Sequence, residues 1–143
     1  MEQHVDPERA AFDAFKALPR DRPVEMLNLL RFRARAAYPD GHERAGAGLT
    51  GAEAYRLYGA ESGPVFRRVG GSILWSGTPE LVLIGPADEA WDAAFIARYP
   101  TAAAFLEMVT DPVYRAAVIH RQAAVLTSRL IRHVPREAGT GFA

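Results

Sequence analysis

The chain has 143 residues with 17 basic and 17 acidic side chains, and it contains no cysteine. A chain of this length is expected to form one domain that buries roughly two-thirds of its unfolded surface. The balanced charge gives no electrostatic reason to expect nucleic acid or an anionic membrane as partner. The absence of cysteine excludes disulfides, thiolate metal ligands and cysteine nucleophiles. No apolar run approaches the ~18 residues of a membrane helix, and no signal peptide is recognised, so we expect a cytoplasmic protein.

The first predicted element is a helix over residues 6–18, which begins at an Asp-Pro pair and ends before a proline. Its apolar stripe consists of Ala11, Phe12, Phe15 and Leu18. The stripe is short and the other face carries mixed charges, so the helix is expected to pack on the main body. We therefore predict an N-terminal helical extension over residues 1–20, a domain over residues 21–135 and a flexible tail over residues 136–143.

Alternating apolar residues predict four strands. The strands cover residues 24–33, residues 72–77 with a bent continuation at 81–84, residues 91–99 and residues 128–134. In the third strand Trp91, Phe95 and Tyr99 share one face. Asp92 and Arg98 share the other. Both faces of this strand are largely apolar, so both should be covered by other parts of the protein.

Helices are predicted between these strands from their capping residues. Thr50 and Glu53 have the spacing of a capping box, and the helix that they start is expected to kink or break at Gly63-Pro64. Thr101 caps a short helix, and Asp111-Pro112 starts a longer one.

The loop over residues 34–48 is long for a connection in a compact domain. Tyr38 is its one large apolar anchor besides small side chains. We therefore expect this loop to be the most mobile internal segment of the protein.

After the N-terminal helix, the elements follow the order β-α-β-β-α-β, which is the ferredoxin-like arrangement of an α+β protein. An antiparallel four-stranded sheet with helices on one face leaves its other face bare. That face is predicted to carry several of Met26, Phe32, Trp75, Phe95 and Tyr99. Because a monomer rarely leaves so much apolar surface in water, we predict a homodimer whose two sheets pack face to face and enclose a cavity.

The residues that could form a cofactor or metal motif do not have the spacing that such a motif requires. Gly46, Gly48 and Gly51 match the dinucleotide-binding pattern, but they lie too far beyond the preceding strand and lack the acidic partner. The four histidines are scattered, with no pair at the spacing of metal ligands. No P-loop and no nucleophile elbow occur. We therefore predict no metal and no cofactor.

His120 is the most informative ionisable side chain of the sequence. It shares a helix face with Val113 and Ala117 and is expected to be at least partly buried. A buried histidine is more often a hydrogen-bonded core residue than a catalyst, and we favour the structural role. Arg121 and Asp92 carry opposite charges on elements that must pack together. The sequence therefore predicts one buried polar cluster of His120, Arg121 and Asp92.

Further candidate side chains come from the strands and the last helix. With His120 and Arg121, the candidates for catalysis are Tyr99 and Asn28, and the candidates for ligand contacts are Trp75, Asp92, Arg98 and Tyr114. Asn28 also has a structural alternative, a bond to the backbone or to a neighbouring strand, which we favour. If Tyr99 points into the dimer cavity, Trp75 lines that cavity with it. Asp92 and Arg98 then lie beneath the helices as structural anchors.

Several short motifs follow one another along the chain. They are Asn28-Leu29-Leu30, Tyr55-x-x-Tyr58, Gly70-Gly71, Trp75-x-Gly77, Trp91-Asp92, Arg98-Tyr99-Pro100, Ala104-Phe105, Asp111-Pro112-x-Tyr114 and His120-Arg121. In this order the chain resembles the domain-of-unknown-function 1330 family over residues 24–134. The resemblance implies a dimeric α+β barrel, in a superfamily that includes antibiotic-biosynthesis monooxygenases, muconolactone isomerases and chlorite dismutase-like haem proteins. It implies no catalytic residue, because the family has no assigned reaction.

Two functions remain open at this point. The first is a cofactor-free enzyme of the monooxygenase or isomerase kind that acts on a small apolar or aromatic molecule. The second is a non-catalytic dimeric module that binds a small ligand or a protein partner. Haem binding would need His120 or His133 as axial ligand, and nothing selects either. A pocket that joins His120 to the sheet cavity favours the enzyme, whereas a cavity filled by Trp75 and Phe95 favours the module.

Overall fold

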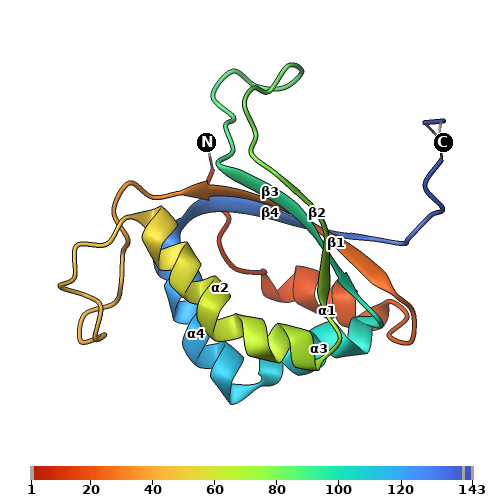
Figure 1. Cartoon of the computed structure of the whole chain (residues 1–143), viewed down its shortest axis with the longest axis horizontal. Coiled ribbons are helices and arrows are strands. Elements are labelled where there is room, and N and C mark those ends of the chain that lie inside the picture. Colours follow the sequence, from red (N-terminus) through yellow and green to blue (C-terminus); the bar gives the residue numbers. More distant parts are fainter. Residues whose placement is uncertain (1, 140, 143) are drawn as a thin grey trace.

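Four antiparallel strands form one sheet in the order β2-β3-β1-β4, in a computed structural model that describes residues 2–139 and 141–142 (Figure 1). The strands are β1 (Val24–Phe32), β2 (Ser72–Gly77), β3 (Ala93–Tyr99) and β4 (Val125–His133). Strand β1 pairs with β3 and β4, and β3 also pairs with β2. This order is the ferredoxin-like one, so the predicted fold class is confirmed.

The helices lie on one side of the sheet (Figure 1). They are α1 (Arg9–Ala17), α2 (Gly51–Arg68), α3 (Ala102–Thr110) and α4 (Pro112–Ala124). Helix α2 starts at the predicted capping box, in which Thr50 and Glu53 each accept a backbone N–H of the other. Helix α4 starts at Asp111, whose carboxylate accepts the Val113 N–H at 2.7 Å. Helices α2 and α4 pack against each other and carry most of the cover over the sheet.

Two predicted boundaries are wrong. Helix α2 continues through Pro64 without a break. Proline has no N–H to donate to the carbonyl of Ala60, but Ala60 is exposed, so this carbonyl is not buried without a partner. Residues 81–84 form no strand, because they belong to a loop between β2 and β3 that projects beyond the sheet (Figure 1).

The predicted orientation of the sheet is also wrong. The register pairs Val24 with Tyr99 and Met26 with Ala97, so these side chains share one face. That face lies against the helices, since Val24, Met26 and Tyr99 are all buried. Phe95 lies on the same face, opposite Asn28. Alternation in the sequence says which residues share a face, but the direction in which the connecting helices pack decides which face is covered.

The buried core beneath the helices consists of two separate clusters. The larger one contains Val24, Met26, Val65, Val69, Ala97, Tyr99, Ala102, Ala104, Phe105, Met108 and Tyr114. The smaller one contains Leu30, Ala54, Ala124 and Val125. Phe95 is half-buried and packs against both. In the middle of the covered face the two clusters are joined only by half-buried side chains such as Phe95.

The N-terminal segment and helix α1 contact the sheet through strand β4. The Ser128 N–H donates to the His4 carbonyl at 2.7 Å, which adds the N-terminal segment to the edge of β4. The Arg132 guanidinium donates to the carbonyls of Phe15 and Pro19, beside α1. In the part of the chain that the structure describes, no helix has the length and apolar composition to cross a membrane.

Candidate functional site

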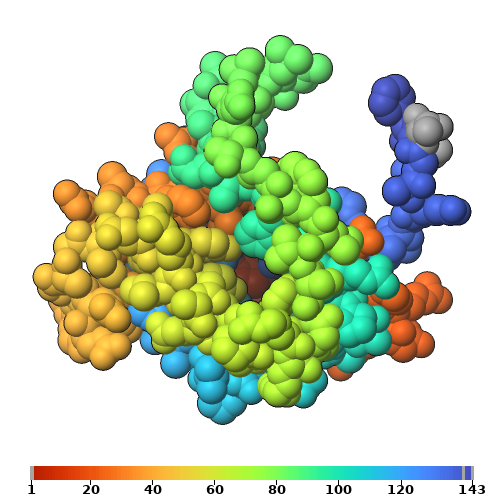
Figure 2. Space-filling view, viewed as in Figure 1, coloured from red at the N-terminus to blue at the C-terminus, as the bar shows by residue number. Residues whose placement is uncertain are grey.

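The covered face of the sheet has a gap over its centre. Along β1, Met26 and Leu30 are buried, but Asn28 between them is only half-buried. Its neighbour on β4, Leu130, points the same way and is 41% exposed. Figure 2 shows the surface hollowed between helix α2 and the edge of the sheet, with atoms of the N-terminal segment visible at the bottom. We call this space the hollow.

Helix α2 places two tyrosines beside the hollow. Tyr55 and Tyr58 lie three residues apart, one turn along the helix, and their rings are 5.3 Å apart. The Tyr58 hydroxyl lies 3.0 Å from the hydroxyl of Tyr114 on α4. One hydrogen bond between two phenols uses one of their two protons. The phenol that accepts this bond keeps its own proton for another acceptor, such as an oxygen of a bound molecule.

The hydroxyl of Tyr55 has no hydrogen-bond partner among the described residues. Burial raises the pKa of Tyr55 and of Tyr114, and in both the nearby Tyr58 raises it further. The positive charge of Arg121 lowers the pKa of both phenols, but less than burial raises it. The phenols therefore stay protonated at neutral pH and serve as hydrogen-bond donors.

Arg121 is held in place from two sides. Its guanidinium donates to the Val5 carbonyl at 2.6 Å and to the Ser128 hydroxyl at 3.3 Å. A guanidinium has five N–H donors, so these two bonds leave others for a ligand. Arg121 thus supplies a fixed positive charge between α4 and β4.

Asn28 supplies an amide to the floor of the hollow. Its side-chain N–H donates to the Met26 carbonyl at 3.0 Å, as the structural alternative for this residue predicts. The amide oxygen and the second N–H have no partner among the described residues. Asn28 is therefore both a structural residue and an available polar group.

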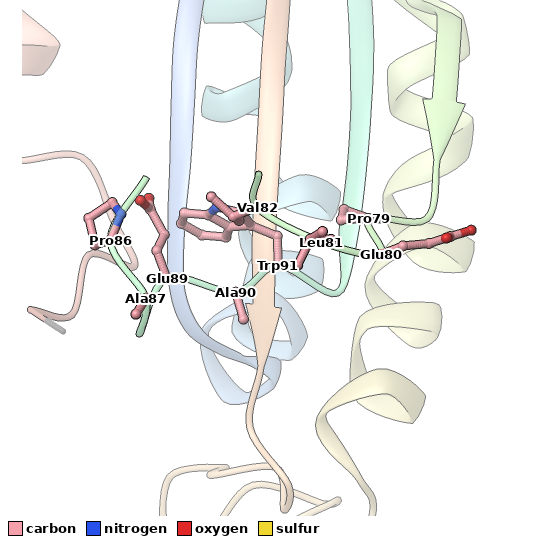
Figure 3. Close-up of a pocket in the computed structure, with 9 residues that line it drawn as sticks. All are labelled: Pro79, Glu80, Leu81, Val82, Pro86, Ala87, Glu89, Ala90 and Trp91. Carbon is pink, nitrogen blue, oxygen red and sulfur yellow. The ribbon is translucent and has the colours of Figure 1, made fainter. Parts of the chain in front are cut away.

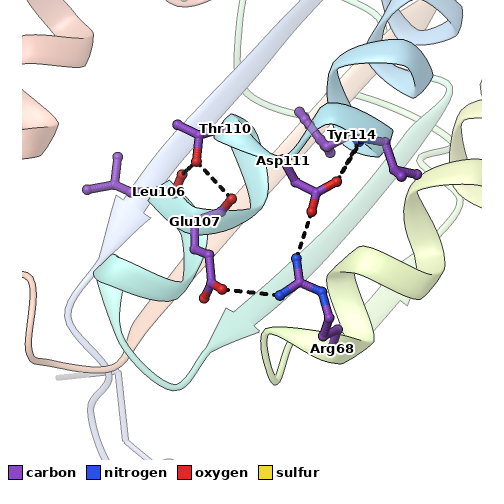
Figure 4. A network of polar contacts seen from close by, with 7 residues as sticks. Arg68, Leu106, Glu107, Thr110, Asp111 and Tyr114 are labelled. Carbon is purple, nitrogen blue, oxygen red and sulfur yellow. Dashed lines mark hydrogen bonds and ion pairs between the residues drawn. The ribbon is translucent and has the colours of Figure 1, made fainter.

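An ion-pair network fixes the helices that roof the hollow (Figure 4). The Arg68 guanidinium at the end of α2 contacts the Glu107 carboxylate at 3.1 Å and the Asp111 carboxylate at 2.8 Å. Asp111 also caps α4 through the N–H groups of Val113 and Tyr114. The network joins α2, α3 and the start of α4, and so sets the position of Tyr114.

The predicted cluster of His120, Arg121 and Asp92 does not form. His120 is buried, as expected, but its Nδ1 lies 2.6 Å from the Tyr38 hydroxyl and its Nε2 lies 2.5 Å from a carboxylate oxygen of Glu61. A neutral imidazole satisfies both partners, since Nε2–H donates to Glu61 and Nδ1 accepts from Tyr38. His120 points toward α2 and the loop over residues 34–48, about a third of a helix turn away from the face of Arg121. Because the two side chains point in different directions, His120 does not join Arg121 and Asp92 in one cluster.

The loop over residues 34–48 is anchored to the helices by Tyr38. The ring of Tyr38 stacks on His42 at 4.7 Å and meets His120 edge-on at 5.5 Å. Burial raises the pKa of Tyr38, the nearby Arg44 lowers it, and the Glu61 carboxylate raises it. Tyr38 is therefore a neutral phenol that links the loop to the buried imidazole.

The remaining predicted site residues lie outside the hollow. Tyr99 is buried in the larger core cluster, where its hydroxyl contacts the Met108 sulfur at 3.9 Å. Trp75 is half-exposed on the face of the sheet that has no helices, where it pairs with Ile96. Arg98 lies on that face too and contacts the Glu25 carboxylate at 3.6 Å.

Asp92 ends strand β1 instead of facing a ligand. Its carboxylate accepts the Phe32 N–H at 2.8 Å, and its own N–H donates to the Leu30 carbonyl. Of the predicted candidates, the structure thus brings Asn28, Tyr114 and Arg121 to the hollow. Tyr55 and Tyr58 were not among the predicted site residues, although their spacing of one helical turn was a usable signal.

No group of three histidine, aspartate or glutamate side chains with metal-binding geometry occurs in the described part of the chain. The donors at the hollow are phenols, an amide and a guanidinium, which are poor ligands for most metal ions. The hollow therefore offers a bound molecule hydrogen bonds and a positive charge.

Comparison with known proteins gives one family and several related structures. A family described as "Domain of unknown function (DUF1330)" matches residues 46–133. The RPA0582 protein of unknown function from Rhodopseudomonas palustris is 56% identical over 96% of this chain and 100% of its own, with a TM-score of 0.88. A structure of methylated RPA0582 has the same identity and a TM-score of 0.90 over 98% of this chain and 100% of its own.

A more distant structure shares the fold alone. SnoaB from Streptomyces nogalater, described as a cofactor-independent oxygenase, is 16% identical, with a TM-score of 0.51 over 84% of this chain and 99% of its own. No curated protein matches this chain.

Proposed function

The chain belongs to the DUF1330 family, and we propose that it binds a small, largely apolar or aromatic molecule in the hollow and acts on it without a cofactor. The observation that carries the proposal is the gap between the two core clusters, which is bordered by hydrogen-bond donors. Burying an unfilled polar gap is unfavourable, so a ligand is the simplest explanation of this arrangement.

The donors select the chemistry of the ligand. The protonated phenols of Tyr55 and Tyr114 and the fixed guanidinium of Arg121 favour an oxygen that is negative or becomes negative. The apolar walls, such as Phe95 and Leu130, favour a hydrocarbon or aromatic body. The expected ligand is therefore a phenol or a carbonyl compound that forms a phenolate or an enolate.

Such an oxyanion is an intermediate suited to isomerisation by proton transfer or to reaction with oxygen. SnoaB, described as a cofactor-independent oxygenase, shares this fold, but its low identity extends the likeness to the fold alone. The role of the protein in this proposal is electrostatic, because donors that are already in place stabilise charge as it develops.

A non-catalytic ligand-binding module is the second candidate. It is favoured by one observation, that His120 is engaged by Tyr38 and Glu61 and lies away from the hollow. Enzymatic proton abstraction needs a base near the bound molecule, and the phenols of the hollow are donors.

Para-nitrophenol is a suitable probe of the hollow, because its anion is coloured. We expect the bound probe to ionise at lower pH than the free probe, since Arg121 and the phenols stabilise the anion. Tyr58→Phe should weaken this shift, whereas Tyr99→Phe removes a buried hydroxyl outside the hollow and should leave it unchanged. Equal titration curves for the free probe and all variants would contradict the proposed site.

A proton-exchange experiment distinguishes an enzyme from a non-catalytic binding module. Indanone, an aromatic ketone, exchanges its α-protons in deuterated water through an enolate, and nuclear magnetic resonance follows this exchange. Faster exchange with wild-type protein, reduced in Tyr58→Phe, supports the enzyme. Binding without any acceleration supports the module.

The proposed assembly is a homodimer formed through the face of the sheet that has no helices, which we call the open face. Its apolar side chains are Leu27, Leu29, Trp75, Ile96 and Ile131. Trp75 and Ile131 are among the exposed large apolar residues. Light scattering is expected to give twice the 15.6 kDa of one chain, and the mass of one chain at micromolar concentration would contradict this assembly.

A further inference from the structure

The loop over residues 78–92, which we call the arm, projects from the sheet on the side away from the helices (Figure 1). Three of its apolar side chains are almost fully exposed: Leu81 at 79%, Leu83 at 86% and Ile84 at 92%. A row of exposed large apolar side chains on a projecting loop is unfavourable in water and marks a contact surface.

The arm is a folded segment with a fixed base. Val82 and Trp91 are among the residues that line a cavity of about 210 Å³ within the arm (Figure 3). The Trp91 ring faces the Arg129 guanidinium at 5.3 Å, which ties the arm to β4. The Arg31 guanidinium donates to the Asp88 carbonyl at 3.3 Å, which ties it to β1. These contacts hold the exposed side chains in one direction.

Charge indicates which partner fits the arm. Residues 78–92 contain four acidic side chains and no basic one: Glu80, Asp88, Glu89 and Asp92. The open face carries three arginines and one glutamate: Arg31, Arg98, Arg129 and Glu25. Within one chain Arg31 and Arg129 contact the base of the arm and Arg98 contacts Glu25. The face still has a net positive charge and the arm a net negative one, so a second copy of the same chain offers complementary charge.

The tail beyond β4 completes the surroundings of the open face. It leaves the opposite end of the sheet and turns up on the same side as the arm (Figure 1). Together with Leu27 and Ile96 it borders a space of about 420 Å³, and its Val134 is 77% exposed. A twofold axis over the open face therefore meets apolar surface at both ends of the sheet.

We propose that the arm of each protomer lies against the partner's sheet in the homodimer, with Leu83 and Ile84 buried on the partner. The inference rests on the homodimer of the proposed function and adds a contact that sheet packing alone does not require. It explains why a row of large, exposed apolar side chains stands on a loop instead of in the core.

The first test is the double variant Leu83→Asp/Ile84→Asp, with Val113→Asp as control. Val113 is 54% exposed and starts α4 on the helix side, so its aspartate adds charge outside the proposed contact. We expect the dimer dissociation constant of the arm variant to rise on the order of a hundredfold, because two unpaired charges would be buried. The control should match wild type in light scattering across a dilution series.

The outcomes separate the two proposals. A wild-type monomer contradicts the homodimer and the arm contact together. A wild-type dimer with an unchanged arm variant contradicts the arm contact alone.

A second test does not depend on weakening the dimer. The chain has no cysteine, so Leu83→Cys gives one attachment point for a photoactivated benzophenone. Labelled protomers are mixed with isotopically heavy, unlabelled protomers, irradiated, digested and analysed by mass spectrometry. We expect cross-links from the arm to heavy peptides of the sheet or the tail, and cross-links confined to the light chain would overturn the inference.

Discussion

Both faces of the sheet carry large apolar side chains, but they differ in their polar groups. On the covered face the polar groups near the centre are hydroxyls, an amide and one guanidinium with spare hydrogen-bonding capacity. On the open face they are charged side chains, among which Arg98 already contacts Glu25. Unused donors beside a hollow are typical of a ligand site, whereas an apolar face with charges suits a protein contact. The proposed ligand site and the proposed dimer contact therefore lie on opposite faces of the same sheet.

The strongest way to break this comparison is to place a charge on each face in turn. Phe95→Asp puts an unpaired carboxylate between the two core clusters, and we expect no stable fold by circular dichroism. Ile96→Asp, the next residue, points to the open face and should leave a folded protein with weaker dimerisation. Equal damage from the two variants would show that both faces are parts of one core.

Alkaline pH should lower the stability of the protein through the buried tyrosines on the helix side of the sheet. Burial raises the pKa of Tyr55, Tyr99 and Tyr114 above that of a free phenol. Their contribution to stability is fully present below pH ~10, the unfolded value, and falls as the unfolded phenols ionise above it. At one pH unit above that value, the raised pKa of each tyrosine is expected to lower the free energy of unfolding by about 1.4 kcal/mol. Urea titrations at several pH values measure this loss. A flat profile up to pH ~11 would contradict the burial of these hydroxyls.

His120→Ala tests whether the buried imidazole belongs to the ligand side. It removes contacts to Tyr38 and Glu61 and leaves a small cavity, so the free energy of unfolding should fall by about 1–3 kcal/mol. Because His120 lies away from the hollow, para-nitrophenol binding should persist at temperatures where the variant is folded. Tyr38→Phe, which removes one of the two contacts, is the milder control. Loss of binding without loss of stability would assign His120 to the site.

Tyr58→Phe sharpens the role of the phenol pair. The change keeps the ring and removes one hydroxyl, so stability should change by about 1 kcal/mol or less. Binding of para-nitrophenolate, measured by absorbance titration, should weaken by about tenfold. An unchanged affinity would place the bound oxygen elsewhere than between Tyr58 and Tyr114.

The smallest expected effect concerns the loop over residues 34–48. Hydrogen exchange should be faster there than in other internal segments, except near its ends. The N–H groups of Ala36 and Ala37 donate to the carbonyls of Leu49 and Ala123 and should be protected. Exchange throughout the loop as slow as in β1 would show that the whole loop is packed structure.

The local part of this structure follows from the sequence. The capping residues Thr50 and Asp111 start α2 and α4 where the sequence predicts, because a cap acts only on the next turn of its own helix. The strands follow from alternation, and their order with the helices leads to the ferredoxin-like connection. The burial of His120 was also predictable, since it shares a helix face with small apolar residues.

The tertiary structure decided which face became the inside and which polar groups met there. Alternation is symmetric with respect to the two faces of a strand, so it left Tyr99 and Trp75 on one side, whereas helix packing and an irregular register in β2 separated them. The partners of His120 come from a loop and a helix that lie 82 and 59 residues earlier in the chain. Contacts over such distances depend on how whole elements pack, and no local pattern contains them. For the same reason the hollow over Asn28 could be recognised only once the two core clusters were in place.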